Sequence, residues 1–326
     1  MRNVVIFDEY RERDIKPAAA LERYIELVGR DVKSMMAGTK LREVDCPGCQ
    51  SADRTPAFFR FGCEYSECGG CGTLYVTLRP DDAALRAFYV DSPARRYWRN
   101  ELAAPVSNVR TDKVLKPRSA WVTDSAAEYI EGPAHFVELR ATDDTFVRAL
   151  SATDGLASAR VVEPWFGGTN GESERGKRGD PVNVVALFES IDRASDVDAL
   201  VASAREMLAP GGICLLTSIL ASGFDVQVLW EKAANIFPPD RLNVLTVEGV
   251  RSLVSRHGFE ITELSTPGVL DVDIVERVRT ESPDAPIPRL VRYLFDRRGP
   301  ELRGNLQEFL QANLLSSFGR VLMRRR

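Results

Sequence analysis

The chain of 326 residues is long enough for more than one domain and a large buried core. With 43 basic and 47 acidic residues its formal net charge is −4, so it has no general electrostatic attraction to nucleic acid or anionic lipid. No apolar stretch reaches the roughly 18 residues that a membrane span needs, and the first apolar run, residues 4–7, is too short for a signal-peptide core. We therefore expect a cytoplasmic protein with neither nucleic acid nor membrane as a partner.

Residues 17–38 predict a helix, because apolar residues recur at helical spacing behind Pro17. Four cysteines then predict a metal site. Two C-x2-C pairs lie 18 residues apart, the spacing typical of a zinc ribbon. The predicted ligands are Cys46, Cys49, Cys68 and Cys71.

Four thiolates close the coordination sphere of Zn²⁺, so this site is expected to be structural rather than catalytic. A disulfide framework is the alternative, which a reducing cytoplasm disfavours. Cys63 and Cys214 are interpreted as packed thiols. The aromatic surface of so small a module cannot be buried alone, and we expect the ribbon to dock on a larger domain.

After the ribbon, the pattern changes to helices and then to alternating strands and helices, which indicates an α/β fold with a mostly parallel sheet. A polar, irregular segment is expected at 104–116, and a polar glycine-rich loop at 167–180. The expected regular elements are helices beginning at 81 and spanning 118–130, 145–150, 197–208 and 247–257, and strands at 136–139, 159–162, 182–188, 213–217 and 259–264, with a turn at 209–212.

The C-terminal residues 281–326 predict a helical extension, with helices at 290–295 and 302–315. The second helix has an amphipathic face, typical of core packing or of a homodimer contact. The last three residues, all arginines, are interpreted as a solvated tail, with contact to an acidic partner as the alternative.

Several separated motifs carry a family resemblance. They are Cys68-Gly-Gly-Cys71-Gly-Thr-Leu-Tyr, Arg79-Pro80, the run 182–189, Leu208-Ala-Pro-Gly-Gly212, Gly258-Phe259-Glu260, Thr266-Pro-Gly268 with Leu270-Asp-Val-Asp273, and Ser316-Ser317. In this order the chain resembles a class I S-adenosylmethionine-dependent methyltransferase of the subgroup with an N-terminal zinc ribbon, often associated with sugars or other small metabolites.

The resemblance implies a Rossmann-like, doubly wound methyltransferase sheet with the zinc-ribbon module before it. The expected regions are an N-terminal helical extension at 1–43, the ribbon at 44–78, a helical linker at 79–131, the methyltransferase-like domain at 132–280 and the C-terminal helical extension at 281–326.

The resemblance also assigns cofactor residues. Glu138 corresponds to the strand-end acid of the cofactor loop, and Glu163 to the acid that receives the ribose hydroxyls, with a solvated acid as its alternative reading. The glycines of the family pattern are replaced by Arg140, Thr142 and Asp144, so the motif is degenerate. A non-glycine residue where the turn needs a positive φ costs roughly 1 kcal/mol or more.

Two histidines of the family pattern are replaced by Arg193 and Arg241. We interpret these arginines as an anion subsite for the substrate, with ordinary surface arginines as the alternative. The carboxylates left as candidate general bases are Glu189, Asp192 and Asp240. His135 and His257 lie outside the family motifs and are weak catalytic candidates.

Three functional hypotheses remain open at this point. The first is an S-adenosylmethionine-dependent methyltransferase acting on a small metabolite, such as a nucleotide sugar or another anionic substrate. The second is a catalytically altered homologue that has lost the cofactor and binds a ligand, runs another reaction or acts as an assembly partner. The third is a ribbon-led nucleic-acid module, which the acidic charge balance makes the weakest.

Overall fold

The computed structural model describes residues 10–163 and 182–326. The apolar run at 4–7 and the predicted loop at 167–180 lie outside the described residues. Within the described residues, no helix is both long and apolar enough to cross a membrane.

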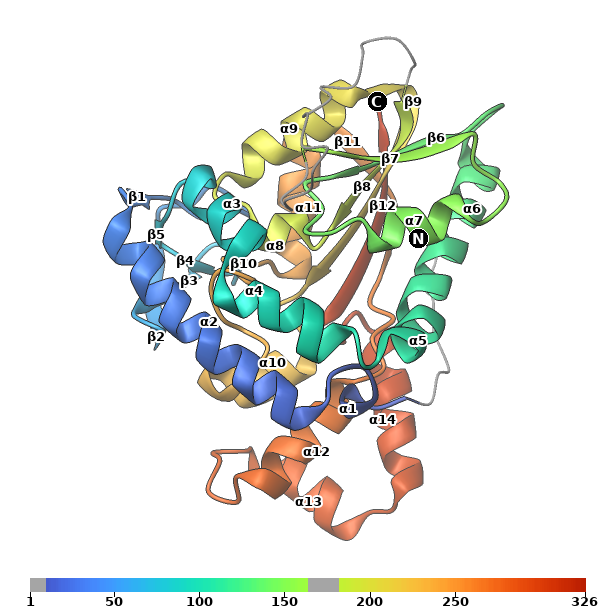
Figure 1. Ribbon diagram of the computed structural model, residues 1–326. Coiled ribbons are helices and arrows are strands. Elements are labelled where there is room, and N and C mark those ends of the chain that lie inside the picture. Colours follow the sequence, from blue (N-terminus) through green and yellow to red (C-terminus); the bar gives the residue numbers. More distant parts are fainter. Residues whose placement is uncertain (1–9, 164–181) are drawn as a thin grey trace.

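A six-stranded sheet forms the centre of the larger domain (Figure 1), with the strand order β11-β12-β9-β8-β6-β7. β6 pairs in parallel with both β7 and β8, and β8 with β9, whereas β12 is antiparallel to its neighbours β9 and β11. The predicted doubly wound α/β sheet is confirmed. The strands are β6 (His135–Leu139), β7 (Ser158–Val162), β8 (Val182–Phe188), β9 (Leu208–Ile219), β11 (Phe259–Ser265) and β12 (Phe318–Arg325).

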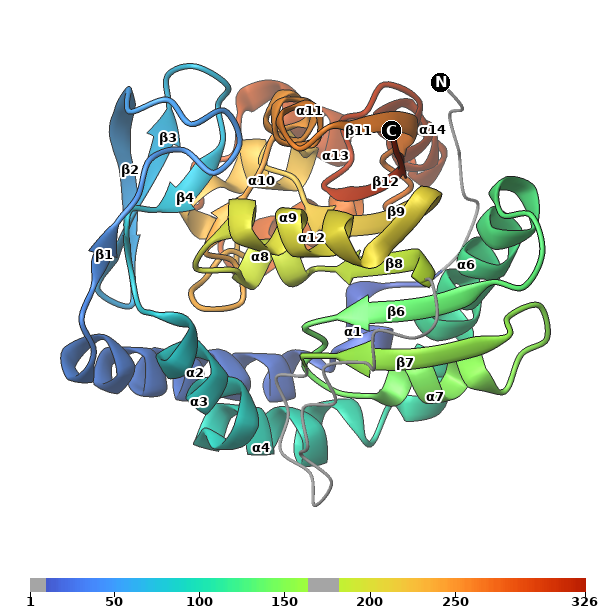
Figure 2. The same ribbon diagram turned by 90° about the horizontal axis from the view of Figure 1, so that it is seen from above.

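Helices cover the two faces of this sheet, on opposite sides of the strands in Figure 2. Because successive strand residues point to opposite faces, Val185 and Leu187 of β8 pack on one side and Val184 and Ala186 on the other. The first side is covered by α9 (Val197–Met207) and α11 (Val247–Arg256), and the second by α6 (Lys116–Tyr129) and α7 (Thr145–Ser151).

The ribbon is built into the larger domain through a shared sheet of order β10-β4-β3-β2. The edge strand β10 comes from the larger domain and pairs antiparallel with β4 of the ribbon. The predicted docking of the ribbon is thus confirmed, and backbone hydrogen bonds carry it. The elements are β2 (Arg54–Arg60), β3 (Cys63–Cys68), β4 (Leu74–Val76) and β10 (Asn243–Val244), beside the small pair β1 (Arg42–Glu43) and β5 (Leu78–Arg79).

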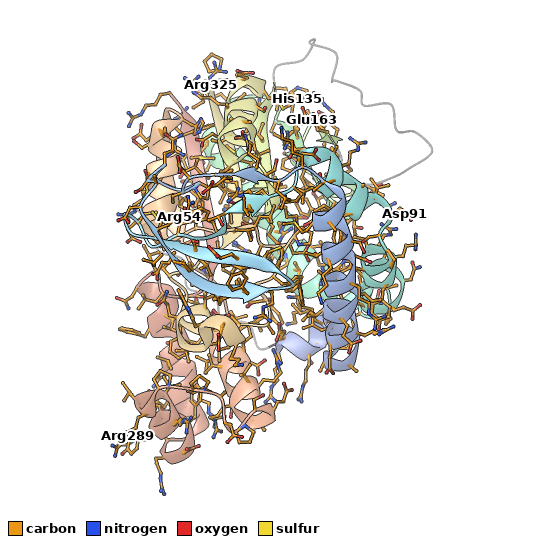
Figure 3. The ribbon with its side chains drawn as sticks, turned by 90° about the vertical axis from the view of Figure 1, so that its left-hand side faces the viewer. Arg54, Asp91, His135, Glu163, Arg289 and Arg325 are labelled. Atoms are coloured by element: carbon orange, nitrogen blue, oxygen red, sulfur yellow. The ribbon has the colours of Figure 1, made fainter. Side chains whose placement is uncertain are left out.

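A third core joins the ribbon to the N-terminal and C-terminal helices, with Tyr24 and Val28 of α2 completely buried. Charged side chains such as Asp91 and Arg289 lie on the outside (Figure 3). The remaining helices are α1 (Glu12–Ile15), α2 (Ala18–Gly38), α3 (Asp82–Asp91), α4 (Pro93–Tyr97), α8 (Ser190–Arg193), α10 (Phe224–Leu229), the short η3 (Trp230–Lys232), α12 (Asp271–Glu281), α13 (Arg289–Arg297) and α14 (Pro300–Ala312).

The prediction of an irregular segment at 104–116 is wrong. The chain continues helically through η1 (Trp98–Ala103), α5 (Ser107–Arg110) and η2 (Thr111–Leu115) into α6. The residues of this segment that face the cavity are a mixture of polar and apolar side chains, so they leave no regular hydrophobic periodicity in the sequence. The predicted turn at 209–212 likewise lies within β9.

The prediction of a helical extension with a solvated tail is wrong for the last residues. α13 and α14 are present, but the chain then forms β12, which lies between β9 and β11. Its apolar run, Val321, Leu322 and Met323, is at most 3% exposed. Three apolar residues flanked by arginines are too short a pattern to distinguish a central strand from a tail. The homodimer contact stays a prediction, with Phe309 of α14 55% exposed.

The position of β12 predicts that its core residues stabilise the whole domain. Met323→Ala should lower the free energy of unfolding by about 2–5 kcal/mol, because it leaves a cavity in the middle of the sheet. The matched control Arg326→Ala, whose side chain is 70% exposed, should change it by less than about 0.5 kcal/mol. Urea unfolding measures both, and equal effects of the two substitutions would contradict the placement of β12.

Candidate active site

A cavity of about 810 Å³ opens at the carboxyl ends of the central strands. Its floor contains Glu138 of β6, Glu189 directly after β8 and Thr217 of β9. The strand order reverses between β6 and β8, because β7 lies outside β6 while β9 lies outside β8. Open α/β sheets bind their ligands in the crevice at such a switch point.

The outer wall of the cavity comes from segments that precede and follow the sheet in sequence. Helices α1, α2 and the 98–115 segment contribute one side, including Tyr24 and Trp98, and residues 267–271 contribute another. The cavity is therefore completed only when the N-terminal helices pack over the sheet.

Basic side chains outnumber acidic ones in this cavity, although the whole chain is acidic. Among the described residues, ten basic and seven acidic side chains line it. Such a lining favours an anionic ligand. The basic residues are Lys16, Arg95, Arg99, Arg110, Lys113, Arg118, Arg148, Arg193, Arg241 and Arg320; the acidic ones are Glu12, Glu138, Asp143, Asp144, Glu189, Asp240 and Asp271.

Glu189 is held by three arginines. Its carboxylate lies 3.5 Å from Arg118 Nη2, 3.2 Å from Arg193 Nη2 and 3.0 Å from Arg241 Nη2. Burial by itself would raise the pKa of Glu189, but the three positive charges outweigh it and hold the pKa below its usual value. Glu189 therefore stays ionised and is a weak proton acceptor.

Arg193 and Arg241 line the cavity as the anion hypothesis requires, but both are already paired with carboxylates of the chain. Their side chains are only 14% and 12% exposed, so the surface-arginine alternative is wrong. Arg241 also lies 3.4 Å from Asp192. These ion pairs neutralise the two arginines that the sequence singled out for the substrate.

Asp192 and Asp240 differ in their access to the cavity. Asp192 is fully buried outside the lining, accepting hydrogen bonds from Ser218 Oγ at 2.5 Å and Ile219 N at 3.1 Å. Burial raises the pKa of Asp192 to about 6. Asp240 lines the cavity, and its two oxygens accept hydrogen bonds from the hydroxyls of Tyr24 and Tyr89, each at 2.9 Å. Asp192 thus supports Arg241, whereas Asp240 faces the ligand space.

Glu138 has a carboxylate oxygen without a hydrogen-bond partner in the described part of the chain. It is 5% exposed, lines the cavity, and its Oε2 has no hydrogen-bond partner among the described residues. Burial raises the pKa of Glu138 to about 8, more than the charge of Arg118 lowers it. A carboxyl group that titrates near neutral pH can take up or release a proton there. The sequence assigned Glu138 to the cofactor only; burial, which no local pattern reports, adds this acid-base property.

The predicted cofactor loop keeps its backbone shape without glycine. Arg140 has a φ of 57°, the left-handed region that glycine favours. Its Nε donates to Glu163 Oε2 at 3.2 Å and its Nη1 to Asp82 Oδ2 at 3.0 Å. Glu163, labelled in Figure 3, is therefore ion-paired rather than simply solvated. Thr142 and Asp144 line the cavity, whereas Arg140 and Glu163 do not.

Neither histidine lines the cavity. His135 Nδ1 lies 3.0 Å from Ser158 Oγ at the opposite ends of the strands, and His257 Nε2 lies 2.7 Å from Asp198 Oδ1. Both imidazoles have local polar partners, and no structural feature assigns them to catalysis.

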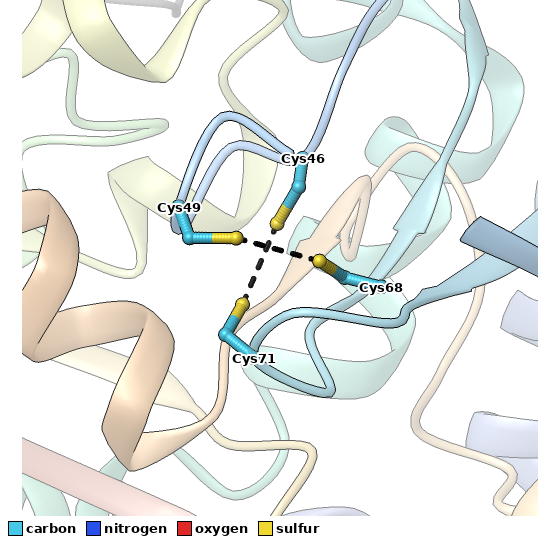
Figure 4. A group of neighbouring side chains, drawn as sticks. All are labelled: Cys46, Cys49, Cys68 and Cys71. Carbon is cyan, nitrogen blue, oxygen red and sulfur yellow. Dashed lines mark hydrogen bonds between the residues drawn. The ribbon is translucent and has the colours of Figure 1, made fainter. Parts of the chain in front are cut away.

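The four predicted zinc ligands lie together in the ribbon (Figure 4), and all four sulfurs are within 4.8 Å of one another. The Sγ atoms of Cys46 and Cys71 are 3.6 Å apart, and those of Cys49 and Cys68 are 3.4 Å apart. A tetrahedral ZnS₄ site with bonds of about 2.3 Å has S–S edges of about 3.8 Å, so the residues fit zinc. All six cysteines are free thiols, against the disulfide alternative.

Contacts beside the cysteines tie this site to α11 of the larger domain. Arg256 Nη1 donates to the carbonyl of Gly48 at 2.7 Å, and Thr246 Oγ1 donates to the carbonyl of Cys71 at 2.6 Å. The metal site therefore holds the docked position of the ribbon as well as its own fold.

We expect about one zinc ion per chain, bound by these thiolates. Cys68→Ser should abolish stoichiometric zinc and lower the melting temperature, since a structural metal contributes folding energy directly. Cys63→Ala, which changes a buried thiol outside the cluster, should keep the metal. Elemental analysis with thermal unfolding measures both, and a zinc-free unmodified protein would refute the assignment.

The buried carboxyl of Glu138 predicts a pH-dependent stability. Its folded-state pKa is about 8, above the unfolded value near 4.5, so its contribution is fully present below about pH 4.5 and is lost as pH rises through about 8. Glu138→Gln removes this titration. The free energy of unfolding of the variant, relative to the unmodified protein, should rise between about pH 5 and 8, by up to roughly 1.4 kcal/mol per pH unit. A difference independent of pH would contradict the raised pKa.

Residues 112–264 match the model of a family described as a methyltransferase domain. No curated protein matches the chain. A similar solved structure is the plantazolicin methyltransferase BpumL in complex with SAH, 11% identical with a TM-score of 0.43, the match covering 74% of this chain and 94% of that one.

Two further solved structures are similar. The cyclopropane synthase MmaA2 from Mycobacterium tuberculosis is 11% identical with a TM-score of 0.35, covering 66% of this chain and 85% of that one. An S-adenosylmethionine-dependent methyltransferase from Mesorhizobium loti is 12% identical with a TM-score of 0.34, covering 65% and 100%. The family match spans β6 to β9 and includes the residues of the cavity floor.

Proposed function

We propose that the chain is an S-adenosylmethionine-dependent methyltransferase that acts on a small anionic metabolite, such as a nucleotide sugar. The observation that carries this proposal is the cavity itself. It lies at the switch point of a methyltransferase domain, and basic side chains predominate in its lining. Its volume, about 810 Å³, lies within the range of small-molecule sites.

Acidic and basic side chains of the cavity are concentrated at different strand ends, although Arg148 pairs with Asp144, and Glu189 and Asp240 lie beside the arginines. Glu138, Asp143 and Asp144 lie on or directly after β6, whereas Arg118, Arg193 and Arg241 surround the end of β8. The carboxylates after β6 suit the sulfonium and ammonium groups of S-adenosylmethionine, and an anionic acceptor suits the basic side chains of the cavity that Glu189 does not already neutralise. The cofactor would supply an electrophilic methyl group.

The chain's own contribution to transfer would be positioning and proton transfer. Glu138 lines the cavity, its buried Oε2 has no hydrogen-bond partner among the described residues, and its pKa lies near the pH at which a general base works best. It would accept the proton that an acceptor hydroxyl loses, at Oε2. Asp240 would orient the acceptor while its oxygens remain bonded to two tyrosines.

Arg140 is the obstacle to cofactor binding. The family resemblance gives Glu163 to the ribose hydroxyls, but its carboxylate already pairs with Arg140, which Asp82 holds from the other side. Cofactor binding must break this pair, so we expect weak affinity in the unmodified protein.

Replacing Arg140 tests this arrangement. Arg140→Gly frees Glu163 at a position whose positive φ suits glycine. Removing the competing ion pair contributes on the order of 1 kcal/mol, so S-adenosylmethionine and S-adenosylhomocysteine should bind roughly fivefold more tightly. Arg86→Ala, an exposed change on α3, should leave the affinity unchanged. Isothermal titration calorimetry measures both. No binding at millimolar cofactor by either the unmodified protein or Arg140→Gly would refute the methyltransferase proposal.

A cofactor-free homologue is the second candidate, and the Arg140–Glu163 pair together with the three missing glycines favours it. The variant carrying Arg140→Gly, Thr142→Gly and Asp144→Gly separates the two. If only this variant binds S-adenosylmethionine, the natural chain has lost the cofactor and the second candidate holds. If the unmodified protein also binds it, the first candidate holds.

A further inference from the structure

Three arginines of the cavity come from elements that lie far apart in the sequence. Arg110 ends α5, Arg118 lies in the first turn of α6 and Arg320 belongs to the C-terminal strand β12. All three line the same cavity, and we call them the outer arginines. No sequence pattern groups these three residues, because the C-terminal residues do not predict a strand of the central sheet.

Aromatic rings fix the orientation of each outer arginine. The guanidinium of Arg118 lies 4.8 Å from the ring centroid of Phe188, that of Arg320 lies 5.1 Å from Trp121, and that of Arg110 lies 5.6 Å from Trp98. Stacking on a ring occupies the face of a guanidinium and leaves its N–H edge for a ligand. The cations are therefore held in place before a ligand arrives.

The outer arginines are poorly neutralised, unlike Arg193 and Arg241. Among the described residues, the acid within ion-pair distance is Glu189, 3.5 Å from Arg118, and it is shared with Arg193 and Arg241. Arg110 donates to the carbonyl of Ile15 at 3.4 Å, and the buried Nε of Arg320 has no hydrogen-bond partner.

The pKa shifts of these arginines agree with the shortage of acidic partners around them. Burial and, to a smaller extent, the positive charge of Arg118 together lower the pKa of Arg320 to about 10. Burial and then Arg118 also lower the pKa of Arg110, partly offset by Glu189. For Arg193, by contrast, the acids outweigh burial and raise the pKa. An anion bound beside the outer arginines would offset the free-energy cost of burying their charges and would reduce the repulsion between them.

We propose that Arg110, Arg118 and Arg320 bind a phosphoryl group of the methyl acceptor, which makes the substrate a phosphate ester. The proposal rests on the proposed function for the role of the ligand as acceptor. A terminal phosphate presents three oxygens, one for each guanidinium, whereas a carboxylate presents two. Glu189 does not oppose the dianion strongly, because Arg193 and Arg241 already neutralise it.

Calorimetric titration of the full chain without cofactor tests the site, with inorganic phosphate, glucose 1-phosphate, glucose and acetate as probes. Both phosphates should bind, and glucose and acetate should not. Arg320→Gln and Arg118→Gln should each weaken phosphate binding at least about tenfold, as expected for loss of a charge-assisted contact. Arg320→Lys should retain part of the affinity, and Arg23→Gln, an exposed change on α2, should retain all of it.

Unchanged phosphate affinity in Arg320→Gln and Arg118→Gln, both folded by circular dichroism, would overturn the assignment. Binding of acetate in place of phosphate would overturn the phosphoryl class. Phosphate binding that depends on Arg320, in a protein that binds no S-adenosylhomocysteine, would support this site while refuting the methyltransferase proposal. The two proposals therefore fail separately.

Discussion

The ion pairs around Glu189 are the constraint on which the cavity depends. One carboxylate at the end of β8 holds Arg118 of α6, Arg193 of α8 and Arg241 before β10, so three segments converge on one buried charge. Leaving any of these groups unpaired in a buried site is costly, typically about 3–5 kcal/mol. The network therefore fixes the shape of the basic side of the cavity and restricts which of its arginines remain available to a ligand.

The ribbon reaches the same network from the other side of the molecule. β10 follows Asp240 and Arg241 directly and pairs with β4 of the ribbon, and Tyr65 Oη donates to the carbonyl of Arg241 at 2.6 Å. The four-cysteine cluster stabilises the ribbon, and β4 of the ribbon pairs with β10, which follows the turn containing Asp240 and Arg241. The four-cysteine ribbon is thus connected to two residues of the cavity, and through β10 it positions part of the cavity wall.

The fold does not depend on the loop that the family resemblance assigns to the cofactor. The sheet depends on the pairing of β6 with β7 and β8, to which the glycines of the loop contribute nothing, so the domain persists with Arg140, Thr142 and Asp144 in their place. Arg140 adopts the required backbone at φ 57° and stabilises the loop through Asp82 and Glu163. The same ion pairs that compensate the strained backbone occupy the acid that the family resemblance assigns to ribose.

The sequence by itself determined the four-cysteine cluster, the alternation of strands and helices, and the positions of Glu138 and Glu189 at strand ends, because each rests on short-range spacing. Only the tertiary structure decided that β12 enters the sheet, that residues 107–116 are helical, that Arg193 and Arg241 are neutralised, and that Arg320 joins Arg118 in the cavity. These features depend on burial and on pairing between residues that lie far apart in the chain, and such contacts leave no periodic signal in the local sequence.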